Sequence, residues 1–234
     1  MEFYFILVEP SVPGNIGASA RAIKTMGFKY LRLVNPSDHL SPESKMLAHA
    51  SMEILESAEV FDDLDQALAD LDLSIATTAK KRNIRADFLR NTELPGLLKS
   101  KGNTVKKTGI VFGCEESGLS NREIKLCDLV STIPLKQSYP SLNLSQAVML
   151  YAYTLSELLL PQEVDRTVHA GKSGPGTSPS PPIPFRIMME RAAEILRRLE
   201  MDRSPALYNR IMERITLLEE DDIHLLLSVL SRLE

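Results

Sequence analysis

The stretch "YPSLNLSQAVMLYAY", residues 139–153, joins two kinds of sequence. Its second half has the apolar content of a buried helix, which we expect over Leu144–Leu160. Its first half alternates small polar residues with leucines, at Ser141, Leu142, Asn143, Leu144 and Ser145. Two interpretations stay open here. Either Asn143 or Ser141 is only the N-cap of the helix, or the polar groups and free amides at this helix start contact a ligand.

Outward from this helix, short apolar runs alternate with helical patterns. We expect strands at Phe3–Val8, Leu31–Val34, Leu73–Thr78, Gly109–Gly113 and Leu129–Pro134. We expect further helices at Ile16–Met26, Asp63–Ala69 and Asn121–Cys127. Continuous apolar runs such as the first are typical of strands that are covered on both faces. The alternation predicts an α/β fold with a mainly parallel sheet.

The composition changes after Leu160, where prolines, glycines and serines become frequent. We divide the chain into a domain at 1–162, a Pro/Gly/Ser-rich linker at 163–184 and a helical extension at 185–234. About fifty helical residues build little core of their own. The extension is therefore expected to pack on a partner or to act as an accessory binding unit.

Several classes of protein are disfavoured by composition. The two cysteines, Cys114 and Cys127, do not form a disulfide framework, which favours a reduced, cytoplasmic compartment. No apolar run is long enough to span a membrane, and "MEFYFILVEPS" is typical of a first strand, not of a signal peptide. No metal site is expected, because the histidines are scattered and the cysteines lack finger spacing. The glycine pattern of a nicotinamide-binding turn is missing as well.

Charge is distributed unevenly along the chain, whose net charge is −4. Residues 53–72 carry only acidic charges, whereas residues 79–107 are mostly basic, with a cluster at Lys80, Lys81, Arg82 and Arg85. A local basic stripe on an acidic protein can bind phosphate chains. The alternative is a solvated loop without a ligand.

Two loops that follow expected strands carry polar residues of interest, since ligands of parallel sheets bind beyond the carboxyl ends of strands. After the first strand, Asn15 and Arg21 lie where a helix begins, and both can face a cleft. A helix cap and a solvated arginine are the simpler explanation. After the fourth strand, "FGCEESGLSNRE" at 112–123 places two glycines around Glu115 and Glu116. Its Ser120 and the glutamate three residues later fit a capping box, which is structural.

Together, these three segments resemble the SpoU/TrmH branch of the SPOUT methyltransferases. "NIGASAR" resembles the first motif of the family, "FGCEESGLS" the second and "SLNLSQAVMLYAY" the third. Within this branch the stretches "ARAIKTMGF", "LRLVNP", "TTAKKR" and "LLLSVLSRLE" are most similar to the TrmJ subfamily of tRNA 2′-O-methyltransferases. The resemblance covers about residues 3–160 well and the C-terminal extension loosely.

The resemblance implies a SPOUT fold, in which the C-terminal segment of the domain threads a loop to form a trefoil knot. It also implies a pocket for S-adenosylmethionine, with the adenine held by Leu142 and Leu144. The cofactor-binding residues would be Thr77, Thr78, Ala79, Gly113, Gly118, Leu119, Ile133, Pro134, Leu135, Ser141, Leu142 and Asn143.

The implied activity is methylation of a ribose 2′-hydroxyl of tRNA, at nucleotide 32 of the anticodon loop. The implied catalytic residues are Arg21, Asn15, Glu115, Ser141 and Asn143, with Arg21 orienting the hydroxyl and Asn15 placing Arg21. Lys80, Lys81, Arg82 and Arg85 would bind the tRNA backbone. A homodimer would complete the site, with the helix at Leu144–Leu160 in its interface or in the core of one protomer. The alternatives are an rRNA ribose methyltransferase of the same branch and a non-catalytic RNA-binding module.

One position departs from the pattern. TrmJ-like proteins often carry an arginine after the glycine of the second motif, and this chain has Cys114 there. We interpret Cys114 as a small buried residue and not as a nucleophile. We expect this departure to change the affinity or the specificity for RNA.

Overall fold

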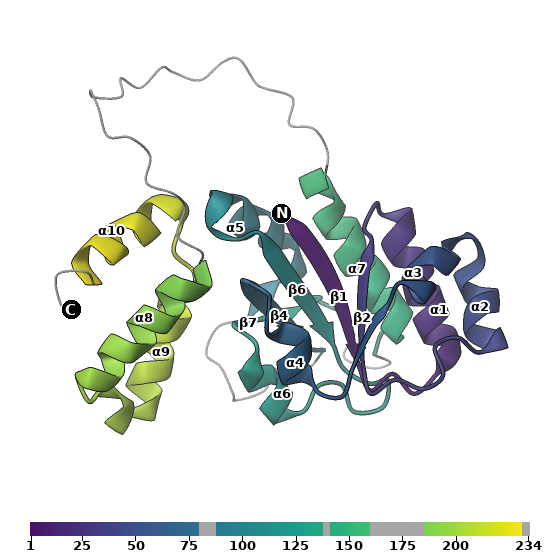
Figure 1. Ribbon diagram of the computed structural model, residues 1–234, viewed down its shortest axis with the longest axis horizontal. Coiled ribbons are helices and arrows are strands. Elements are labelled where there is room, and N and C mark those ends of the chain that lie inside the picture. Colours follow the sequence, from purple (N-terminus) through teal and green to yellow (C-terminus); the bar gives the residue numbers. More distant parts are fainter. Residues whose placement is uncertain (80–87, 138–140, 160–184, 231–234) are drawn as a thin grey trace, which may run out of the picture.

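The computed structural model describes residues 1–79, 88–137, 141–159 and 185–230 (Figure 1). Its sheet has seven strands in the order β3-β2-β1-β6-β4-β7-β5, and every neighbouring pair is parallel. The strands are β1 (Glu2–Val8), β2 (Tyr30–Val34), β3 (Glu59–Phe61), β4 (Leu73–Thr77), β5 (Leu89–Arg90), β6 (Lys107–Phe112) and β7 (Leu129–Thr132). Their carboxyl ends therefore meet at one edge of the sheet.

Helices cover both faces of this sheet. One buried cluster joins the sheet to α1 (Pro13–Thr25), α2 (Pro42–Ala48), α3 (Met52–Glu56), α5 (Leu94–Ser100) and α7 (Leu144–Ser156). The second cluster, on the opposite face, joins it to α4 (Leu64–Leu68) and α6 (Asn121–Leu126). Short 3-10 turns occur at His49–Ser51, Asn91–Glu93, Gly102–Thr104, Glu157–Leu159 and Met201–Arg203. Two covered faces explain why β1 is apolar at nearly every position.

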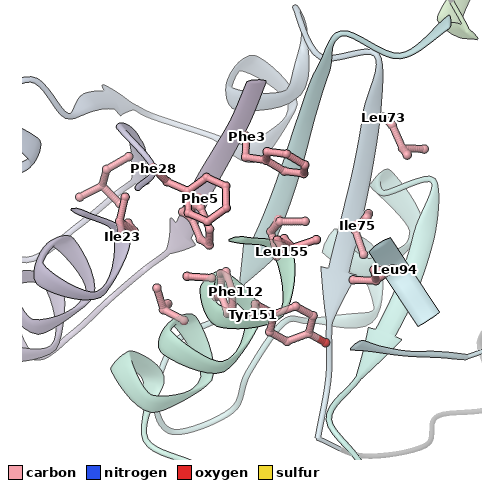
Figure 2. Close-up of a cluster of buried hydrophobic side chains, with 14 of the residues drawn as sticks. Phe3, Phe5, Ile23, Phe28, Leu73, Ile75, Leu94, Phe112, Tyr151 and Leu155 are labelled. Atoms are coloured by element: carbon pink, nitrogen blue, oxygen red, sulfur yellow. The ribbon is translucent and has the colours of Figure 1, made fainter. Parts of the chain in front are cut away.

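Aromatic rings fill the first cluster beneath α7 (Figure 2). The ring of Phe112 stacks on that of Phe5, with centroids 6.4 Å apart. Tyr151 of α7 meets Phe112 edge to face, with centroids 5.5 Å apart. Such pairs add to the free energy gained by burial alone. The core therefore fixes α7 directly on the central strands.

Helices α1 and α2 approach each other closely at Gly17. A Cβ atom at this position would lie 2.0 Å from the carbonyl oxygen of Ser44. Any larger residue would push the two helices apart. Gly17 thereby fixes the start of α1, the segment that carries Asn15.

The five expected strands and the parallel sheet are confirmed, with ends that shift by one to two residues. Strands β3 and β5 were missed, because strands of three and two residues are too short to show a pattern of apolar and polar residues. The expected helices at Ile16–Met26, Asp63–Ala69 and Asn121–Cys127 are α1, α4 and α6, whereas the short helices α2, α3 and α5 were missed. The expected helix at Leu144–Leu160 is α-helical only as far as Ser156. The linker expected at 163–184 lies outside the described residues.

The C-terminal residues form α8 (Phe185–Arg198), α9 (Pro205–Thr216) and α10 (Glu220–Leu230). These helices pack on this chain's own first part, through Phe185, Met188 and Ile223 in the first buried cluster. Polar contacts reach the loops that precede β4, β6 and β7. Arg186 donates to the carbonyl oxygen of Leu71 and lies 3.5 Å from the carboxylate of Asp128.

The tightest of these contacts is at Lys101, which is completely buried. Its Nζ donates to the carbonyl oxygens of Thr216 and Leu218 and lies 4.9 Å from the ring centroid of Phe185. Thr216 ends α9, so the ammonium group satisfies carbonyls that a helix end leaves free. The C-terminal helices are thus held at the amino ends of the strands. Across the described ranges, no helix has the length and apolar character needed to cross a membrane.

Candidate active site

A pocket lies at the opposite edge, where β4, β6 and β7 end and α7 begins. Its walls come from four segments that are far apart in the sequence. They include most of the residues predicted to bind a cofactor, at Thr77, Thr78, Ala79, Gly113, Gly118, Leu119, Ile133, Leu135, Ser141 and Leu142. Pro134 and Asn143 are not part of this lining, although both belong to the same segments.

The loop after β6 folds back on itself. The amide of Gly118 donates to the carbonyl oxygen of Cys114 at 2.9 Å, and Gly118 has a φ of +67°. A Cβ atom on Gly113 would lie 2.1 Å from the amide nitrogen of Leu119. Both glycines are therefore required by the shape of the loop. The loop ends at Ser120, whose capping box with Glu123 is confirmed.

Glu115 lies at the centre of a hydrogen-bond network at the pocket. Its carboxylate accepts from the side-chain amide of Asn15 at 2.8 Å and from the amide and hydroxyl of Ser11 at 3.0 and 2.9 Å. Partial burial acts to raise the pKa of Glu115, but the hydrogen bonds from Asn15 and Ser11 outweigh it, so this pKa lies below its ordinary value. The carboxylate is therefore a fixed negative charge that anchors the start of α1.

Asn143 joins the third segment to this network. Its side-chain amide donates to the Oδ1 atom of Asn15 at 2.8 Å. Its own Oδ1 accepts from the amide and hydroxyl of Ser145, and the amide of Asn143 donates to Gln146, so Asn143 is the N-cap of α7. The capping interpretation is confirmed for Asn143. The same side chain nevertheless connects α7 to α1 and, through Asn15, to the loop after β6.

Other predicted site residues are placed differently. Arg21 is exposed on α1 and is not among the described residues that line the pocket. Ser141 is exposed at the pocket wall, just before α7. Lys80, Lys81, Arg82 and Arg85 lie outside the described residues. Their roles stay predictions.

Cys114 corrects an expectation. It is half-buried and lines the pocket, with its Sγ atom 3.0 Å from the hydroxyl of Ser117. The expectation of a buried residue is wrong, because the glycine turn directs this part of the loop toward the cavity and not into the core. Within the described ranges, no cluster of histidine, cysteine and carboxylate groups is suited to hold a metal ion.

Sequence reasoning missed several lining residues, among them Ala147 and Tyr151 on α7. A signal for them exists in the sequence. Leu144, Ala147 and Tyr151 are spaced by three and four residues, which places them on one face of a helix. The helix start was recognised as a possible wall, whereas the rest of the helix was expected in a dimer interface or in the core of one protomer.

The lining has a composite chemical character. The aliphatic side chains of Leu119, Ile133, Leu135, Leu142 and Leu144 provide an apolar wall. Hydroxyl groups of Thr77 and Thr78 and the carboxylates of Glu115 and Glu116 add polar and negative groups. Apolar pockets with a few convergent polar groups are typical of small-molecule sites. The lining suits a ligand that has an apolar part, polar groups and a positive charge.

Comparisons with known proteins agree with this geometry. The SpoU rRNA Methylase family matches residues 2–153. LasT of Escherichia coli (strain K12), named an uncharacterized tRNA/rRNA methyltransferase, is 37% identical over 235 residues, which cover 100% of this chain and 98% of LasT. The tRNA (cytidine-2′-O-)-methyltransferase TrmJ of Methanocaldococcus jannaschii is 40% identical over 154 residues, which cover 64% of this chain and 65% of that protein.

The solved structures include the crystal structure of TrmJ from Z. mobilis ZM4. It superposes with a TM-score of 0.65 at 28% sequence identity and covers 100% of this chain and 99% of that chain. A probable methylase family protein from Haemophilus influenzae Rd KW20 superposes with a TM-score of 0.65 at 31% identity and covers 98% of this chain and 94% of that chain. The matched domain and the full-length similarity to LasT show that this chain belongs to the SpoU rRNA methylase family of methyltransferases.

Proposed function

We propose that this protein transfers a methyl group from S-adenosylmethionine to a ribose 2′-hydroxyl of tRNA, at nucleotide 32 of the anticodon loop. One observation carries the proposal. Asn15 is hydrogen-bonded to both Glu115 and Asn143, so that one residue from each of three distant motifs meets beside a pocket at the carboxyl ends of the strands. The relatives named TrmJ support tRNA ribose as the substrate.

The lining suits S-adenosylmethionine on chemical grounds. The aliphatic wall with Leu142 and Leu144 would hold the adenine, and the carboxylates of Glu115 and Glu116 would favour a cation. When bound, the cofactor supplies a methyl group on a positively charged sulfur. Backbone groups of the segments at 77–79, 113–119 and 133–135 would fix its ribose and its amino acid part.

The chain's own residues must position a poor nucleophile and handle one proton. A guanidinium group donates hydrogen bonds and does not accept protons, so Arg21 would orient the 2′-hydroxyl and a neighbouring phosphate. Asn15 would place the start of α1 and thereby Arg21. Glu115 and Asn143 would hold Asn15, and Ser141 at the pocket wall would contact the hydroxyl or the arginine.

A homodimer would complete this site. Arg21 is exposed outside the pocket of its own chain, which supports delivery of its side chain to the pocket of the partner subunit. The outward side of α7 exposes Leu150 and Tyr153, apolar surface that a second copy would cover. We further propose that the domain carries the trefoil knot of SPOUT proteins, that Lys80, Lys81, Arg82 and Arg85 bind tRNA phosphates, and that the enzyme acts in the cytoplasm.

A second substrate class remains in competition, because the family model and the name of LasT both include rRNA. The deciding experiment incubates the purified full chain with labelled S-adenosylmethionine and, separately, total tRNA and rRNA. The modified ribose is then mapped. A single 2′-O-methyl mark at nucleotide 32 is the expected result. A mark on rRNA would favour the second class, methylation of a base nitrogen would contradict ribose chemistry, and no transfer to either RNA would favour a non-catalytic binding module.

A further inference from the structure

Ser131 lies at a junction beneath the pocket. It is fully buried in β7, next to the last residue of that strand. Its hydroxyl accepts a hydrogen bond from the phenol of Tyr151 at 3.0 Å, and its carbonyl oxygen accepts from the amide of Thr78 at 3.0 Å. One residue therefore links α7 and the segment after β4, and it precedes the third pocket segment, 133–135.

Tyr151 is the residue of α7 at this junction. It is 1% exposed, it lines the pocket from α7, and Figure 2 shows its hydroxyl directed away from the aromatic cluster. Burial raises the pKa of the Tyr151 phenol, although the hydrogen bond to Ser131 acts in the opposite direction. The phenol is therefore protonated at neutral pH and serves as a hydrogen-bond donor.

The junction extends to β6 through a second hydroxyl. Thr77 donates to the carbonyl oxygen of Val111 at 2.9 Å, two residues before Gly113. Two hydroxyl hydrogen bonds, from Tyr151 and Thr77, and the backbone bond from Thr78 to Ser131 thus connect α7 and the ends of β4, β6 and β7. Phenylalanine and alanine would fill much of the same space as Tyr151 and Ser131 without burying polar atoms. Buried hydroxyls require partners, so this pair holds α7 in a defined register that apolar packing alone leaves loose.

We propose that Tyr151 and Ser131 are positioning residues that set α7, with the lining residues Leu144 and Ala147, against the strand ends that would hold the cofactor. This inference rests on the proposed function of the pocket as a site for S-adenosylmethionine. Neither residue needs to touch the reacting atoms. Their effect is expected in the affinity for the cofactor and not in the rate of the chemical step at saturation.

The test compares Tyr151→Phe with wild type by calorimetric titration of S-adenosylmethionine and by steady-state methylation kinetics. We expect the Kd of the cofactor to rise about five-fold, with kcat at saturating cofactor unchanged. Ser131→Ala should have the same effect. The double variant should be no worse than either single variant, because each single change already breaks the same hydrogen bond.

Tyr30→Phe is the matched control. It removes the same hydroxyl from an exposed tyrosine at the amino end of β2, where only a 3.5 Å contact with Glu2 is lost. Its cofactor Kd should equal that of wild type. If Tyr151→Phe fails to fold, Ser131→Ala provides the same measurement.

The outcomes separate the two proposals. If wild type does not bind S-adenosylmethionine, the proposed function fails. If wild type binds it and both single variants bind it equally well, the positioning role is overturned, even where their melting temperatures fall. A fall in kcat at saturating cofactor with an unchanged Kd would overturn it too.

Discussion

The Nζ atom of Lys101 lies 2.5 Å from the carbonyl oxygen of Thr216, in a site with no solvent exposure of the lysine. Burial lowers the pKa of Lys101 to about 8, while the charge of Glu219 acts in the opposite direction. The side chain thus joins the C-terminal helices to the sheet, and its protonation is linked to folding.

The first prediction concerns pH. In the unfolded chain Lys101 has its ordinary pKa of 10.5, so between pH 8 and 10.5 the unfolded state binds a proton that the folded state lacks. The contribution of this group to the free energy of unfolding therefore rises with pH in that window. Urea unfolding of wild type and Lys101→Met at several pH values measures it. The difference, wild type minus variant, should increase from pH 8 to 10.5.

The variant serves here as the control, because other groups that titrate in this window contribute equally to both proteins. A difference that is flat across the window, or that falls with pH, would contradict the assigned environment of Lys101. Two carboxylates lie near this site: the charge of Glu219 acts on Lys101, and Glu220 accepts a hydrogen bond from the amide of Asn103.

The second prediction compares two glycines. Gly102 has a φ of +51°, and a Cβ atom there would lie 1.7 Å from a carboxylate oxygen of Glu220. Gly102→Ala should lower the free energy of unfolding by about 1–2 kcal/mol through backbone strain and displacement of Glu220. Gly96 in α5 has open space around its Cβ position, so Gly96→Ala should raise stability by about 0.5–1 kcal/mol.

Chemical denaturation of the two variants measures this contrast in sign. Equal effects of both substitutions would mean that Gly102 does not pack closely against Glu220 of α10. Amide exchange in α10 offers a second readout, since Gly102→Ala should accelerate exchange there and Gly96→Ala should not.

The third prediction concerns Arg21. Arg21→Ala should abolish methyl transfer and leave the affinity for S-adenosylmethionine nearly unchanged, because the residue lies outside the pocket of its own chain. Lys29→Ala, an exposed change shortly after α1, is the matched control and should retain activity. Loss of cofactor binding in Arg21→Ala would contradict the assigned role.

Mixing two inactive variants tests whether Arg21 acts across subunits. Leu142→Arg blocks the pocket wall and keeps Arg21, whereas Arg21→Ala keeps the pocket. A mixed dimer contains one intact pocket next to one intact Arg21 if the arginine acts on the partner. Activity should therefore return after co-refolding or co-expression. If the mixture stays inactive while it forms mixed dimers, Arg21 acts within its own chain.

The fourth prediction concerns RNA binding. Replacement of Lys80, Lys81, Arg82 and Arg85 by glutamine should weaken tRNA binding and reduce the slope of log K against log salt by about 3. Filter binding at several salt concentrations measures both effects. A control with Lys99 and Lys125 replaced should keep the wild-type slope. An unchanged slope in the fourfold variant would favour a solvated loop.

Much of the fold was readable because its strands are covered on both faces. The run at β1 and the helical spacing of α7 give strong signals, and the glycines around Glu115 mark a tight turn. Strand β5 was unreadable, because two residues gain their pairing with Ser131 and Thr132 only from the assembled sheet. The contact of Lys101 with Thr216 could not be predicted for a related reason. The lysine is held by backbone carbonyl oxygens, and the pattern of side chains in a sequence does not show where these will lie.

The candidate site, like the fold, was predictable from the sequence only in part. The loop after β6 was predictable because ligands bind beyond the carboxyl ends of parallel strands, whereas the segments at 77–79 and 133–135 were expected only from the family resemblance. The network of Asn15, Glu115 and Asn143 required coordinates, because it joins residues about a hundred positions apart. Sequence alone also failed to separate the cap role of Asn143 from its bridging role, and the structure assigns both to one amide.

Because the seven strands are parallel, the molecule has two different poles: one at the carboxyl ends of the strands and one at their amino ends. The reactive pole is assembled from loops that evolution can alter residue by residue. At the other pole, the C-terminal helices pack against the amino ends of the strands and are held there by Lys101. A C-terminal extension of different sequence can therefore replace them at this interface without a change to the pocket at the opposite edge.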